Sequence, residues 1–84
     1  MSQLNSVIIE GKFKHFTSKK GVLPLCFVLE NNKSGTKKDF VISIESEKMA
    51  DIFVKQKKDT VRVVGYLEKV SKSVIIIAEH IECK

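Results

Sequence analysis

The chain has 84 residues, of which 43% are hydrophobic and 30% are charged, and its formal net charge is +5. This composition excludes a disordered chain and predicts one globular domain over residues 1–84. No apolar run approaches the ~20 residues of a membrane-spanning helix. The first residues also lack the basic-then-apolar layout of a signal peptide, so we expect a cytoplasmic protein.

Alternation of apolar and polar residues predicts the first strand over residues 6–14. Val7, Ile9 and Phe13 share one face, and charged residues occupy the other. This period of two is typical of a strand with one buried side. Ile8 is an apolar residue on the charged face and could be a subunit contact.

A polar loop over residues 15–21 leads to a second predicted strand over residues 22–30. Turn-forming and charged residues over 31–38 then predict a hairpin loop, and a third strand is expected over residues 38–45. The residues expected on the core side of the second strand are Leu25, Phe27 and Leu29.

One helix is predicted after the third strand. Ser46 is a suitable N-cap, and Met49, Ile52 and Phe53 recur at helical spacing. Acidic residues come early in this segment and lysines late, which is the order that the helix dipole favours.

Two more strands are expected, over residues 60–68 and 73–82, joined by a short basic turn at residues 69–72. The centre of the last strand is apolar on both faces, so both faces should be covered. Three strands, a short helix and two strands are the order of the OB-fold. We therefore predict an all-β protein with one short helix, folded as a five-stranded OB-fold Greek-key barrel.

The residues of these elements resemble a known family over nearly the whole chain. Asn5–Gly11, Lys48–Phe53 and Val61–Leu67 are similar to segments of the bacterial single-stranded-DNA-binding proteins. Gly21–Glu30 and Val74–Glu82 are similar to strands of its replication-restart branch, primosomal replication protein N (PriB). The resemblance implies a homodimer that binds single-stranded DNA and contacts the restart helicase and loader proteins of the primosome.

A site that binds single strands without regard to sequence combines cations along the phosphates with rings on which bases stack. Because the chain has 14 Lys and no Trp, we expect phosphate contacts to outweigh stacking. Phe40 could head the core row or lie exposed for stacking, and lysine-rich loops can also serve solubility alone. The candidate nucleic-acid-binding residues are Lys12, Lys14, Phe16, Lys19, Lys20, Lys37, Lys38, Phe40, Arg62, Tyr66, Lys69 and Lys72.

Catalytic and metal chemistry are not expected. Cys26 and Cys83 have no partners at zinc-finger spacing, and His15 and His80 are scattered. No nucleophile, base or pair of acids forms a recognisable constellation, so the sequence predicts neither an enzyme nor a cofactor. The alternative function is an OB-fold protein-interaction module, or a small general single-strand-binding protein, that binds nucleic acid weakly.

Overall fold

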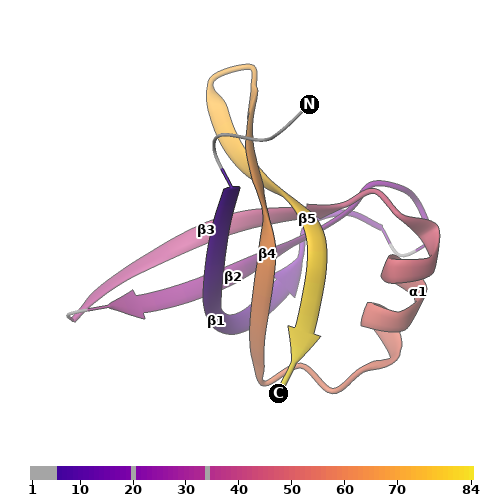
Figure 1. Cartoon of the computed structure of the whole chain (residues 1–84), viewed down its shortest axis with the longest axis horizontal. Helices are drawn as coiled ribbons and strands as arrows, with labels where there is room; N and C mark the ends of the chain where they lie inside the picture. Colours follow the sequence, from indigo (N-terminus) through magenta and orange to yellow (C-terminus); the bar gives the residue numbers. More distant parts are fainter. Residues whose placement is uncertain (1–5, 20, 34) are drawn as a thin grey trace.

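The computed structural model describes residues 6–19, 21–33 and 35–84. This part of the chain forms five strands and one helix (Figure 1). The elements are β1 (Ser6–Phe16), β2 (Leu25–Lys33), β3 (Thr36–Ile44), α1 (Glu47–Lys55), β4 (Thr60–Val70) and β5 (Ser73–Cys83).

The strands close into a barrel in the order β1-β2-β3-β5-β4, and β4 pairs with β1 to complete it. Neighbouring strands are antiparallel except β3 and β5, which run parallel and pair at Ile42 with Ile76 and at Ser43 with Ile77. The predicted five-stranded OB-fold barrel is therefore confirmed.

Several element ends differ from the prediction. β1 continues to Phe16 because a bulge between Phe13 and His15 lets it follow β2 further. β2 begins only at Leu25, so the apolar residues before it belong to the loop. In the last hairpin β4 and β5 pair up to Val70 and Ser73, which shortens the predicted basic turn.

The barrel interior holds the apolar residues that alternation placed there. Phe27, Leu29, Ile42 and Val63 are fully buried, and together with their neighbours they form one core. Helix α1 begins where predicted, because Ser46 accepts a hydrogen bond from the Met49 amide at 3.3 Å. Among the described residues, the other fully buried apolar side chains are Leu25, Ile44, Phe53 and Val61.

Helix α1 connects β3 with β4 and contributes the ring of Phe53 to this core. The ring of Phe53 stacks on that of Phe27 with a centroid separation of 4.5 Å. Lys58 holds the end of the helix, since its ammonium group donates to the carbonyl oxygens of Phe53, Val54 and Gln56 at 2.7–3.1 Å.

Two hairpins extend from the barrel in different directions, as Figure 1 shows. The β2–β3 hairpin pairs from Leu25 with Ile44 out to Lys33 with Thr36, and the β4–β5 hairpin ends at Val70 and Ser73. Among the described residues no helix is long and apolar enough to cross a membrane.

Candidate nucleic-acid interface

Three of the candidate lysines share the outer side of the sheet formed by β1, β2 and β3. Lys12 pairs with Glu30, and Glu30 pairs with Asp39, so these three side chains share a face. Lys37 precedes Asp39 by two residues and therefore points to the same side. Lys14 joins them, because its ammonium group contacts both carboxylates. We call this surface, defined by Lys12, Lys14 and Lys37, the lysine face.

A shallow groove crosses the lysine face. It has a volume of about 300 Å³ and contains both Lys12 and Lys37, which are exposed. Its other lining residues are Glu10, Gly11, Glu30, Asn31, Asn32 and Thr60. The groove is polar and carries both charge signs, so it suits a polar ligand more than an apolar one.

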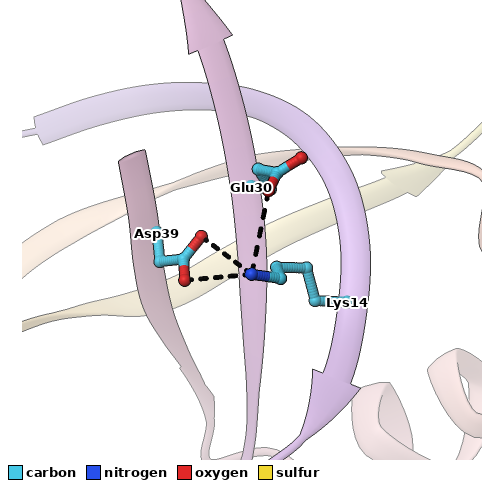
Figure 2. Close-up of polar contacts among 3 residues, drawn as sticks. All are labelled: Lys14, Glu30 and Asp39. Atoms are coloured by element: carbon cyan, nitrogen blue, oxygen red, sulfur yellow. Dashed lines mark hydrogen bonds and ion pairs between the residues drawn. The ribbon is translucent and has the colours of Figure 1, made fainter. Parts of the chain in front are cut away.

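Lys14 is held between two carboxylates (Figure 2). Its Nζ donates to Asp39 Oδ2 at 3.2 Å and to Oδ1 at 3.4 Å, and it lies 3.7 Å from Glu30 Oε2. The hydrogen bond to Asp39 and the charge of Asp39 raise the pKa of Lys14. The ammonium group therefore stays protonated at neutral pH, and it is engaged within the protein.

The β1 bulge decides where Phe16 lies. Phe13 pairs with Leu29 and His15 with Val28, so Lys14 is the extra residue. This extra residue shifts the alternation and turns Phe16 toward the core. The ring of Phe16 packs edge-on against that of Phe13, with 5.0 Å between centroids. A half-buried ring in the core cluster is poorly placed for stacking on a base.

Phe40 heads the core row of β3. It pairs with Leu29 and points to the same side as Ile42 and Ile44, both of which are fully buried. Phe40 itself is half-buried and packs against the core. Of the two positions that the sequence left open, the structure favours the inner one.

Lys38 shares this inner side of β3 by alternation, so it lies off the lysine face although it is exposed.

Arg62 and Tyr66 lie on the outer side of β4. Arg62 is exposed opposite Glu10 of β1 and Glu82 of β5. Burial raises the pKa of the Tyr66 hydroxyl, and the charges of three carboxylates add to this shift: Glu45, Glu68 and Glu79. Because these surroundings are acidic, Tyr66 is poorly placed to meet a phosphate.

The remaining described candidates do not belong to the lysine face: Lys69 lies near the end of β4, and Lys19 and Lys72 lie outside the strands. Lys69 and Lys72 are exposed at the end of the β4–β5 hairpin, and Lys19 is exposed in the loop between β1 and β2. Lys20 lies outside the described residues. The structure thus gathers three of the predicted lysines on one face and distributes the other candidates over different elements.

Comparison with known proteins identifies the fold. No family model matches the sequence, and no curated protein matches it. One similar solved structure is Rim1, a mitochondrial single-stranded-DNA-binding protein of S. cerevisiae; the TM-score is 0.76 and the identity 15%, and the match covers 93% of this chain and 90% of that chain. Another is a small single-stranded-DNA-binding protein of Mycoplasma pneumoniae, with a TM-score of 0.71 and 15% identity over 95% of this chain and 93% of that chain. A third is the N-terminal domain of PriB from Thermoanaerobacter tencongensis, described as dimeric (TM-score 0.67, 20% identity, 95% and 96%).

The chain has the OB-fold. Identities of 15–20% over almost the full length of each chain establish the architecture that these proteins share with it. The short helix between β3 and β4 and the closed five-stranded barrel fit the same architecture.

The sequence named the three lysines of this face as candidates without bringing them together, and it did not name the acidic and amide groups beside them. Glu30 and Asp39 are equally distant along the chain from the end of the β2–β3 hairpin, and this symmetry was a readable signal that they oppose each other. Asn31 gave no comparable signal. Its side chain donates to the backbone carbonyl of Glu10 at 2.7 Å, which ties β2 to β1 at the edge of the groove.

Proposed function

We propose that the chain is a single-stranded-DNA-binding protein without enzymatic activity, and that its lysine face follows the phosphates of the strand. The observation that carries this proposal is the convergence of Lys12, Lys14 and Lys37 on one side of an OB-fold barrel. Solved structures with the same fold include single-stranded-DNA-binding proteins, which supports this proposal.

Binding of this kind depends on electrostatics more than on base stacking. Ammonium groups that neutralise phosphates release condensed counterions, and this release drives association at low salt. Phe16 and Phe40 pack at the core, so the lysine face offers the bases few rings. We therefore expect weak, sequence-tolerant binding, to which Lys69 and Lys72 of the β4–β5 hairpin contribute when the strand is long enough.

Fluorescence anisotropy of a labelled oligothymidylate across a salt series tests this proposal. An oligonucleotide of about 30 nucleotides exceeds the ~4–16 nucleotides that one OB-fold occupies. Each neutralised phosphate contributes about −0.7 to the slope of log K against log salt, so three contacts predict a slope near −2. No binding to the single strand at the lowest salt would contradict the proposal, and a duplex of the same length measures the preference for single strands.

We further infer that two copies of the chain pair and serve replication restart in the cytoplasm, in contact with the restart helicase and loader proteins. The dimeric PriB domain supports this inference. The edge of β1 supports the pairing: Val7 to Glu10 pair with β4, whereas β2 joins β1 only from Lys12 onward.

The restart role predicts that the protein binds a purified restart helicase stably in a pulldown. If the helicase does not bind, the proposed function is reduced to the binding of single-stranded DNA.

A further inference from the structure

Lys14 differs from the other lysines of the lysine face because its ammonium group is already shared between two carboxylates. We propose that Asp39 and Glu30 limit the affinity of this face: they hold Lys14, so that a phosphate binds it only by displacing a carboxylate. This inference rests on the proposed function and concerns the regulation of the same site.

The geometry of the cluster makes the three groups depend on one another. Lys14 extends from β1, Glu30 from β2 and Asp39 from β3, and Figure 2 shows both carboxylates turned toward Nζ. Glu30 and Asp39 are direct cross-strand partners, and like charges in such a pair destabilise a sheet. Lys14 offsets this repulsion. A phosphate that draws the ammonium group away leaves two opposed carboxylates beside its own negative charge.

The balance of charges on the lysine face explains why replacing a carboxylate by a phosphate at Lys14 affects the affinity. The lysine face has three ammonium groups, and Glu30 and Asp39 offset two of them, whereas Glu10 at the groove is paired with Lys84 at 2.9 Å. The carboxylates lie within 4 Å of Lys14 Nζ, well inside the Debye length of ~8–10 Å at physiological salt. The carboxylates therefore offset the charge of Lys14, and Lys12 and Lys37 become the lysines available for the first contacts of a strand.

The exposure of the cluster sets the size of the effect. The side chains of Lys14, Glu30 and Asp39 are 37%, 24% and 52% exposed, so water screens their interactions and the ion pair is weak. The carboxylates therefore reduce the affinity without blocking the site. A single phosphate would exchange one contact of Lys14 for another, whereas a strand also gains Lys12 and Lys37, so the cluster favours strands over mononucleotides.

The deciding experiment is an anisotropy titration of Asp39→Asn with the oligothymidylate described above. The substitution keeps the shape of the side chain and releases Lys14 from its closer partner. We expect the affinity at low salt to rise about 3- to 10-fold, in keeping with the loss of one nearby charge. Asp51→Asn on α1 is the matched control, because it removes the same charge from an exposed residue on another element, and it should change the affinity less than 2-fold.

A double-mutant cycle with Lys14→Gln separates displacement from simple repulsion. The gain from Asp39→Asn should disappear when Lys14 is already replaced. A gain that persists without Lys14, or an equal gain from Asp51→Asn, would overturn the inference. So would an unchanged affinity of Asp39→Asn when the wild-type protein binds, whereas failure of every form to bind would overturn the proposed function instead. If Asp39→Asn does not fold, Glu30→Gln takes its place in the cycle, with a smaller expected gain.

Discussion

At the scale of single residues, two glycines are needed in this barrel for different structural reasons. Gly65 lies beside the bulge where β4 passes β5, and a Cβ added there would overlap the backbone carbonyl oxygen of Ile77. Gly35, in the turn of the β2–β3 hairpin, has open space around it but a φ of +78°. Gly65 is thus required for close packing of strands, and Gly35 for backbone conformation.

Gly65→Ala is expected to destabilise the protein by about 1–3 kcal/mol, because the strands must separate to admit the methyl group. Gly35→Ala should cost about 1 kcal/mol, since a Cβ strains the left-handed backbone conformation but meets no other atom. The free energies of unfolding in urea measure both changes. A loss for Gly65→Ala no larger than that for Gly35→Ala would contradict the close packing at this crossing.

How far individual residues can be read from the sequence depends on whether alternation continues unbroken. It placed Phe13 and Phe27 at the core and Lys12 on the outside, as observed. It could not place Phe16, because Lys14 and His15 are both polar and nothing in the pattern marks one of them as the extra residue of a bulge.

At the scale of elements, β1 combines two environments in one strand. Lys12 has a partner on both sides, the residues after it pair with β2, and Val7 to Glu10 pair with β4. Ile8 in the first half of β1 is 64% exposed on the outer side. An exposed strand edge with an apolar side chain is a ready site for pairing with a second copy, and a two-fold axis would place the same residues on both sides of the contact.

The proposed dimer predicts that Ile8→Lys shifts the protein toward the monomer without unfolding it, because two lysines would then meet across the contact. Sedimentation velocity over a range of concentrations measures this shift. Val74→Lys is the control, since Val74 is 59% exposed on the β4–β5 hairpin, and it should leave the dimer intact. A wild-type protein that sediments as a monomer throughout the range would contradict the dimer.

The types and order of the elements were more readable than their ends. Helix α1 was recognised from its cap and its spacing, both of which are local signals. The start of β2 was misplaced because Val22 and Leu23 have the composition of a strand, yet they lie exposed in the preceding loop. A strand begins where its backbone first pairs with a neighbouring strand, and that pairing depends on residues far away in the sequence.

At the scale of the whole molecule, the arrangement of charge matters more than its sum. The net charge of +5 does not predict which lysines act together, because closure of the barrel decides which strands become neighbours. Pairing of β1, β2 and β3 brings Lys12, Lys14 and Lys37 onto one side, and the same pairing brings Glu30 and Asp39 beside them. The fold was predictable from local patterns, whereas this mixture of charges required the register of three strands.

The most direct test of the lysine face compares two double variants in the oligothymidylate titration. Lys12→Gln/Lys37→Gln removes two charges from the lysine face, and Lys48→Gln/Lys55→Gln removes two exposed charges from α1. We predict that the first variant loses about 10-fold in affinity at low salt and that its salt slope falls by about 0.7 for each lost contact. The second variant should bind as the wild-type protein does. Equal losses in the two variants would show that net charge, and not the lysine face, holds the strand.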